Sequence, residues 1–359
     1  MVKWKPLEQL QEGDVIAENI LGSNSQDLIV HTGQLVSKAL IQKLHSRGIS
    51  WISVFEDVRK AVQIHSAPFS QEKLDEMEEE ISQVFEKILK EERVEVARVE
   101  TLGREISHAI ISTYGEYLVP SLSKLRELDD YTFNHQVNVS IIATSIAAEM
   151  FPHDIGMVER IATGGLLHDM GKLWIPLEIL NSKKRLADME FDIIKKHPKY
   201  GHGIALMSGI EDQVVLDCIL FHHERVDGTG YCTGLKGEEI PFAGRLMMVA
   251  DVFDALTSVR PYKKGWSPYD AVSFIIKETG KMFDQKIVNP FIKAFGIYPV
   301  GTEVLLSDGL KGTVVGNRKG TISRPLISFE RNGESKLVDL FERKDLRVVE
   351  VLRGALATG

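Results

Sequence analysis

The chain has 359 residues, a length that predicts two or three domains with a sizeable buried core. Its net charge of −8 disfavours a general nucleic-acid-binding surface, which is normally basic. Two cysteines, Cys218 and Cys232, indicate that no disulfide framework is needed, and no apolar run reaches the ~18 residues of a membrane span. With an N-terminus that lacks the apolar core of a signal peptide, these features predict a cytoplasmic protein without a membrane segment.

Residues 1–65 are predicted to form a small α+β module. Short apolar runs alternate with turn residues, and the pattern becomes helical between Ser37 and Arg47. Gly48 is placed to end that helix, and Trp51–Phe55 reads as a strand. Sensing a ligand, binding a partner and capping the rest of the protein are alternative roles for this module.

Residues 66–105 are predicted to be a helical connector. Between residues 70 and 100, glutamates and lysines are interspersed with regularly spaced apolar residues, a pattern typical of a solvated amphipathic helix. The alternative is a helix that forms a homodimer or transmits a signal to a protein partner.

Residues 106–297 show helical periodicity almost throughout, broken by a loop at Asp227–Ile240. Residues 298–359 change to short alternating strands at Glu303–Leu306, Gly312–Val315, Pro325–Phe329 and Lys336–Leu340. The pairs Asp308-Gly309 and Asn332-Gly333 supply turns between them. The expected fold class is therefore mainly α, with a small α+β module before the helical domain and a small β-rich module after it.

The pair His168-Asp169 is the first candidate metal-binding feature in the helical domain. Neighbouring residues on a helix differ by about 100°, so this pair cannot chelate one ion as residues one turn apart would. It can instead serve two ions, with the carboxylate bridging them and the imidazole binding one. Lys172 would then place a fixed positive charge near a phosphate held by that pair of ions.

The run His222-His223-Glu224 followed by a glycine-rich loop is the second feature, because adjacent histidines beside a carboxylate are typical of a metal site. Three further residues are ambiguous alone. His135 and His197 fit a satisfied histidine and a helix-terminal cation as well as ligands. Asp251 lies in the apolar helix Phe242–Leu256, where a buried carboxylate needs either a metal or an arginine such as Arg245 as its partner.

Over about residues 110–297, these motifs resemble the HD-GYP subgroup of the HD-domain metal-dependent phosphohydrolases. The matching stretches, in order, are His168-Asp169-Met170-Gly171-Lys172, His197-Pro198, His222-His223-Glu224-Arg225 with Asp227-Gly228-Thr229-Gly230-Tyr231, Val249-Ala250-Asp251, and Phe253 to Tyr262. Such a set at these spacings is highly specific. It leaves the N- and C-terminal segments without an assigned function.

The resemblance implies a helical HD-type bundle that hydrolyses the bacterial messenger cyclic di-GMP to pGpG and, in some members, to GMP. It implies that the metal ligands are His135, His168, Asp169, His197, His222, His223 and Asp251. Asp169 matches the bridging carboxylate of the family. Asp169 and Lys172 are the residues that the resemblance implies to be catalytic. Substrate contacts are implied for Lys172, Gly228, Gly230, Tyr231, Arg260 and Lys263. The expected mechanism is in-line attack by a metal-bridging hydroxide.

Two positions depart from the family pattern. Cys232 replaces the proline of the signature loop, which removes one rigid φ angle and adds a thiol. Tyr131 stands where members with three metals have a glutamate, so two divalent ions are expected. Iron or manganese suits a site of imidazoles and carboxylates.

Two alternatives to this function remain open. One is an HD-type hydrolase that acts on another cyclic dinucleotide or on a phosphomonoester. The other is a non-catalytic receptor that binds cyclic di-GMP and signals through its terminal modules, although no expected ligand is missing from the sequence. For the mildly basic C-terminal segment, a structural cap is favoured over binding of nucleic acid or of a protein partner.

Overall fold

The computed structural model describes residues 2–21, 28–30, 34–55, 68–112, 117–118, 131–182, 184, 186–258, 265–318, 320–331 and 333–352. The chain divides into two compact units. Unit 1 takes its residues from Met1–Ala67, Glu116–Ser121 and Tyr298–Gly359, and unit 2 from Pro68–Gly115 and Leu122–Ile297. The division of the sequence into four modules stays a prediction, whereas contacts within the chain group its two ends together.

The N-terminal part of unit 1 pairs strand β1 (Val2–Pro6) with β4 (Trp51–Phe55), in antiparallel register from Val2↔Phe55 to Pro6↔Trp51. Strands β2 (Ile20–Leu21) and β3 (Leu28–Val30) form a second small pair, and a 3₁₀ turn η1 covers Leu7–Gln9. Helix α1 (Lys38–Ser46) begins where the Ser37 hydroxyl accepts a hydrogen bond from the Leu40 amide, and it ends just before Gly48. The predicted helix and strand of this segment are confirmed.

The C-terminal part of unit 1 is an antiparallel sheet in the order β10-β6-β7-β8-β9. Its strands are β6 (Glu303–Leu306), β7 (Lys311–Arg318), β8 (Pro325–Arg331), β9 (Glu334–Asp339) and β10 (Val348–Val351), and β5 (Tyr117–Leu118) pairs with β7. The four predicted strands are confirmed to within three residues at each end. Strand β10 was not predicted, because a four-residue edge strand with two exposed residues carries little hydrophobic pattern.

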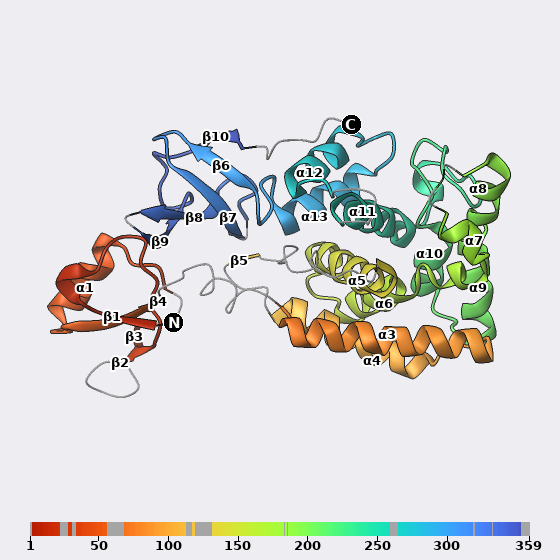
Figure 1. Cartoon of the computed structure of the whole chain (residues 1–359), viewed down its shortest axis with the longest axis horizontal. Helices are drawn as coiled ribbons and strands as arrows, with labels where there is room; N and C mark the ends of the chain where they lie inside the picture. Colours follow the sequence, from red (N-terminus) through yellow and green to blue (C-terminus); the bar gives the residue numbers. More distant parts are fainter. Residues whose placement is uncertain are drawn as a thin grey trace. The chain divides into compact units, whose positions relative to one another are not determined.

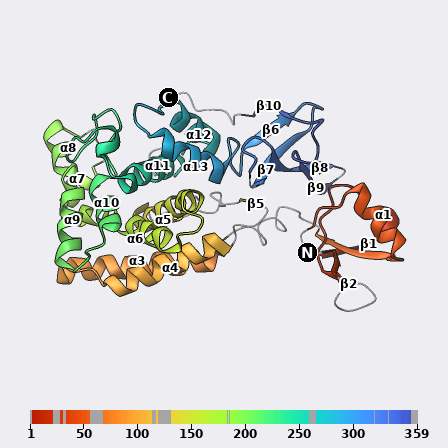
Figure 2. The ribbon, with the colours of Figure 1, turned by 180° about the vertical axis from the view of Figure 1, so that it is seen from behind.

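Unit 2 is a bundle of helices around α5 (Tyr131–Met150), whose described residues are buried almost all round. Helices α6 (Ile155–Leu167), α11 (Phe242–Thr257) and α13 (Gln285–Phe295) pack on α5, and α12 (Pro268–Lys277) packs on α11. Beyond α6 follow η3 (Met170–Trp174), α7 (Leu177–Leu180), α8 (Asp188–Ile194), α9 (His197–Met207), α10 (Gln213–Phe221) and η4 (Gly237–Glu239). Figures 1 and 2 show α5 and α6 lying between the pair α3 (Gln71–Glu91) and α4 (Val96–Ser112) and the α11–α13 group. The fold is mainly helical with a small antiparallel sheet, as predicted.

The amphipathic segment between residues 70 and 100 is two helices rather than one. Helix α3 (Gln71–Glu91) stops at Glu92, which adopts a left-handed conformation with φ of 54°, and α4 (Val96–Ser112) follows. The apolar face of α3, including Met77 and Ile81, is buried in the core of unit 2. The solvated connector was therefore an incomplete description, because the apolar face finds its partner inside this unit. A homodimer through this segment stays a prediction.

Candidate metal centre

The seven residues predicted as metal ligands converge in unit 2 from five different segments. They form two groups in which the potential ligand atoms lie within 4.8 Å of one another: Asp169, His197, His222 and His223 in the first, and His135, His168 and Asp251 in the second. Most of these residues sit at helix ends, since His168 caps the C-terminus of α6, His197 is the first residue of α9 and His222 caps the C-terminus of α10. Helix ends leave the chain free to turn a side chain inward. The cluster could hold a metal ion.

Three of the histidines are oriented in the same way. The Nδ1–H groups of His168, His197 and His222 donate to the carbonyl oxygens of Gly165, Ile194 and Ile219, at 2.8, 2.8 and 2.9 Å. Such backbone bonds fix the ring orientation and leave Nε2 as a lone-pair donor, an arrangement typical of histidine ligands. Burial lowers the pKa of His168 to about 3 and also lowers the pKa of His197. Both rings are therefore neutral at physiological pH.

The Asp169 carboxylate lies between the two groups. Its Oδ1 is 3.1 Å from His197 Nε2 and 3.6 Å from His222 Nε2, while its Oδ2 is 3.5 Å from Nε2 of both His135 and His168. Burial would raise the pKa of this carboxyl, but the nearby positive charge of Lys172 holds it well below the usual range. Asp169 is therefore ionised and faces both groups at once.

Several of these atoms are acceptors that face other acceptors. His197 Nε2 and His222 Nε2 are 3.1 Å apart although each ring already donates through Nδ1. Within the described residues, the buried atoms His168 Nε2 and Asp169 Oδ1 have no hydrogen-bond partner. Buried acceptors without donors are costly. A cation resolves this arrangement, so the donor set fits divalent metal.

His135 and Asp251 complete the second group. His135 Nε2 is 3.3 Å from Asp251 Oδ1, and His135 Nδ1 is 2.7 Å from Asp254 Oδ2, which also accepts from the Ser258 hydroxyl. Burial would lower the pKa of His135, but hydrogen bonds to Asp169, Asp251 and Asp254 raise it well above the usual value. Asp254 thus orients a candidate ligand. The alternative partner considered for Asp251 is absent, because Arg245 pairs with Asp284 instead.

Lys172 reaches the same centre through a short turn. Its ammonium forms an ion pair with Asp169 Oδ2 and is about one-third exposed. The turn packs closely on α9, since a Cβ at Gly171 would lie 1.9 Å from the His197 carbonyl oxygen. Glycine is therefore required for the approach that brings Asp169 and His197 together.

His223 belongs to the centre but also faces outward. Its Nδ1 is 3.7 Å from Asp251 Oδ2, and its ring stacks on Tyr231 with centroids 4.6 Å apart and planes 28° apart. Burial lowers the pKa of His223 well below its usual value and raises that of the Tyr231 phenol. The loop folds tightly here, because a Cβ at Gly230 would lie 2.4 Å from the Arg225 amide nitrogen.

Glu224 holds this loop in place, a role that the sequence analysis did not assign. Its buried Oε1 accepts from the amides of Cys232, Thr233 and Gly234 at 3.0, 2.6 and 3.0 Å, and from the Thr233 hydroxyl at 2.8 Å. The bond from Cys232 could not exist with proline at that position, since proline has no amide hydrogen. Burial also raises the pKa of the Cys232 thiol, which disfavours the reactive thiolate.

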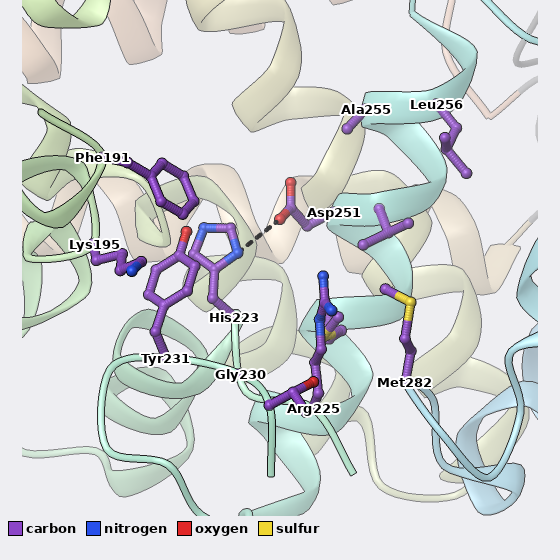
Figure 3. Close-up of a pocket in the computed structure, with 13 residues that line it drawn as sticks. Phe191, Lys195, His223, Arg225, Gly230, Tyr231, Asp251, Ala255, Leu256 and Met282 are labelled. Carbon is purple, nitrogen blue, oxygen red and sulfur yellow. Dashed lines mark ion pairs between the residues drawn. The ribbon is translucent and has the colours of Figure 1, made fainter. Parts of the chain in front are cut away.

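A pocket of about 650 Å³ opens beside the centre (Figure 3). Of the predicted substrate contacts, Gly230 and Tyr231 line it, together with His223 and Asp251. Gly228 is not among its lining residues, and Lys172 lies at the metal centre instead. Arg260 and Lys263 lie outside the described residues, as does the Tyr131 side chain.

Sequence reasoning missed much of the pocket wall. Its other lining residues are Phe191, Lys195, Arg225, Thr229, Met248, Val252, Ala255, Leu256 and Met282. Arg225 stands in the matched motif and could have been noticed there. Phe191 lies in α8, and Lys195 is the residue that caps the C-terminus of this helix. Neither residue belongs to a recognised motif. Only the folding of α8 over the loop brings them to the site.

None of the helices in the described part of the chain is both long enough and apolar enough to span a bilayer.

A family model described as "HD domain" matches residues 119–287. A cyclic di-GMP phosphodiesterase of Pseudomonas aeruginosa is 36% identical over 244 residues, which is 68% of this chain and 58% of that protein. The cyclic di-GMP phosphodiesterase response regulator RpfG of Xanthomonas campestris pv. campestris is 42% identical over 156 residues, 42% of this chain and 41% of that protein.

A third relative differs in its substrate. The 3'3'-cGAMP-specific phosphodiesterase 2 of Vibrio cholerae is 33% identical over 160 residues, 43% of this chain and 31% of that protein. The chain therefore spans less than two thirds of the length of each of these three relatives. The family match covers α5 to α11, which carry all seven candidate ligands. The resemblance read from the motifs is confirmed, and residues 119–287 of the chain belong to the HD-domain family.

Proposed function

We propose that this protein is a metal-dependent phosphodiesterase that hydrolyses cyclic di-GMP to pGpG, and on to GMP if the linear product is also cleaved. The observation that carries the proposal is the Asp169 carboxylate, whose two oxygens face imidazole nitrogens of two separate groups. An arrangement in which one carboxylate is shared by two ligand sets suits a pair of divalent ions. The relatives named above supply the substrate class.

The two groups of side chains would hold one ion each, with Asp169 shared between them. Imidazole and carboxylate ligands favour iron or manganese. Bound ions would supply activation of water and neutralisation of phosphate charge. We include the seven residues as ligands in this proposal, and a cytoplasmic location remains the expectation from the sequence.

The protein's own side chains would hold and orient the substrate. Lys172 places its ammonium beside Asp169, where it can contact a phosphate oxygen. Arg225 lines the pocket, and its side chain forms no ion pair or hydrogen bond within the described part of the chain. A free guanidinium matches a phosphate well, because it offers paired donors. Tyr231 keeps its proton and can only act as a neutral hydrogen-bonding group.

The test is turnover of cyclic di-GMP by the purified protein, prepared anaerobically and loaded with iron(II) or manganese(II). We expect pGpG or GMP to appear and to vanish when a chelator is added. Tight binding of cyclic di-GMP without turnover would contradict the enzyme and support the receptor alternative. A variant with His168→Ala and Asp169→Ala together should lose both metal and turnover.

A second candidate is hydrolysis of a mixed cyclic dinucleotide, favoured by the similarity to the cGAMP-specific relative. The two candidates share the metal centre and differ only in the bases recognised. Competition between cyclic di-GMP and 3'3'-cGAMP for the same enzyme decides between them, since the preferred substrate has the higher kcat/KM.

A further inference from the structure

A row of rings leads from the metal centre toward α8. His223 stacks on Tyr231 with centroids 4.6 Å apart, and Phe191 on α8 stands roughly perpendicular to Tyr231, with centroids 6.3 Å apart and planes 77° apart. All three residues line the same pocket. The row therefore connects the place where a phosphate would be cleaved with a helix that lies outside every recognised motif.

Phe191 is exposed in a way that calls for a partner. The residue is 44% exposed, although aromatic residues usually bury most of their surface. Lys195 places its ammonium 4.8 Å from the ring centroid, and Asp192 Oδ1 holds that ammonium at 2.8 Å. These contacts steady the ring at the pocket without covering it.

The far wall of the pocket is apolar. Met248, Val252 and Leu256 recur every four residues along α11 and so share one face, and Met282 adds to it. Figure 3 shows Phe191 on one side of His223 and Asp251, with Leu256 and Met282 on the other. A phosphate at the centre would thus have an aromatic ring on one side and an apolar surface on the other, which suits a ligand with planar bases.

We propose that Phe191 stacks on a nucleobase of the substrate and selects nucleotides over simple phosphodiesters. This inference rests on the proposed phosphodiesterase function. Stacking on an aromatic side chain is strong enough to raise affinity roughly 5- to 150-fold per base. A diester without a base gains nothing from it, so Phe191 acts as a specificity residue rather than in the chemical step.

The experiment compares two substrates and two variants of the same helix. Phe191→Ala should lower the ratio of kcat/KM for cyclic di-GMP to that for the cyclic diester of two ribose 5-phosphates, which lacks both bases, by roughly 5- to 150-fold, mainly through KM for the dinucleotide. Phe191→Trp should retain the ratio and Phe191→Leu should lose it. Met189→Ala is the matched control, because Met189 is 81% exposed on α8 and does not line the pocket. An unchanged ratio in Phe191→Ala would overturn the inference.

A second readout separates this inference from the proposed function. GMP and ribose 5-phosphate are tested as inhibitors of bis(p-nitrophenyl) phosphate hydrolysis, so that the ratio of their inhibition constants measures the contribution of the base. If the wild-type protein does not cleave cyclic di-GMP but Phe191→Ala removes the preference for GMP, the substrate proposal fails and the stacking stands. If cyclic di-GMP is cleaved and the preference for GMP persists in Phe191→Ala, the stacking fails alone.

Discussion

Each of the two units buries a cluster of charged residues, and the two clusters are built on opposite principles. In unit 1, Lys5 and Lys336 both contact Asp14 and Glu334, at distances from 2.6 to 3.2 Å. Two ammonium groups thus balance two carboxylates. The side chains of Lys5, Asp14 and Lys336 are less than a tenth exposed, yet every charge has an opposite partner.

The metal centre in unit 2 leaves its charges and lone pairs unbalanced. Burial keeps His168 and His197 neutral, and their Nε2 atoms face the ionised Asp169. Hydrogen-bond acceptors of these side chains face one another across the space that a metal ion would fill. The comparison teaches that buried charges alone do not identify a functional site. In a structural cluster every charge is paired with another side chain of the protein, whereas a binding cluster leaves acceptors that only a ligand can satisfy.

The largest effect is expected from Asp169→Asn. The amide loses the negative charge shared by both groups, so we expect metal retention and turnover to fall by more than about 100-fold, because even indirect partners of metal ligands are worth 10- to 100-fold. Metal content per chain and kcat are the measurements. Asp75→Asn, on the exposed face of α3, is the control. Retained metal and turnover would show that the cluster is structural after all.

A substitution in the ion-pair cluster of unit 1 should lower the stability of that unit rather than change metal binding. Asp14→Asn leaves Lys5 and Lys336 buried with Glu334 as the one carboxylate that the described residues offer them, and we expect unit 1 to lose about 3–5 kcal/mol of stability. Hydrogen exchange of the Leu337 amide, which donates to the Gly13 carbonyl oxygen at 3.0 Å, reports on this region. Glu303→Gln, at an exposed position of β6, should leave the exchange rate unchanged. Equal protection in both variants would mean that the cluster contributes nothing.

Asp254→Asn sharpens the comparison inside the metal centre. Asp254 accepts the Nδ1–H bond of His135 and orients that ring without facing the centre itself. We expect metal affinity to weaken about 10- to 100-fold, since partners that orient a ligand have effects of this size. A titration of the metal-free protein with manganese(II) measures the dissociation constant. An unchanged constant would remove His135 from the ligand set or Asp254 from its support.

The smallest expected effect is a pH dependence of the stability of unit 1. Hydrogen bonds from Lys336 and Lys5 lower the pKa of Glu334 from 4.5 to about 2. Because the folded pKa lies below the unfolded one, this stability is present above pH 4.5 and is lost as the pH falls toward 2. The effect is small because the Glu334 side chain is 39% exposed and screened by water. Leu337 exchange should show an acid limb that Glu334→Gln flattens, and an identical limb in the variant would contradict this.

Local sequence signals were sufficient for several elements. Ser37 and Gly48 bracket α1, and the strands β6 to β9 lie within three residues of the ranges that their alternating pattern predicted. The seven candidate ligands were also named from the sequence, and the structure brings all of them together. Rare residue types at fixed spacings carry such information because the chemistry tolerates few substitutes. Their roles as ligands still await the metal measurements.

Other features had no local signal. Glu92 ends α3 in a left-handed conformation. Glycine or asparagine at this position would have indicated that conformation in the sequence, whereas glutamate does not. The pairing of Asp14 with Lys336 joins residues 322 positions apart. Charged residues in a sequence are read as solvated by default, so their burial together could not be inferred.

The sequence by itself determined the fold class, the segments that form most helices and strands, and the residues able to bind metal. Periodicity, caps and rare side chains are properties of short stretches, and they survive in the sequence. Only the tertiary structure decided that both chain ends form one unit, that Glu224 anchors the signature loop, and that Phe191 and Arg225 line one pocket. These depend on contacts between distant segments, whose energy is shared among many residues and leaves no pattern in any one of them.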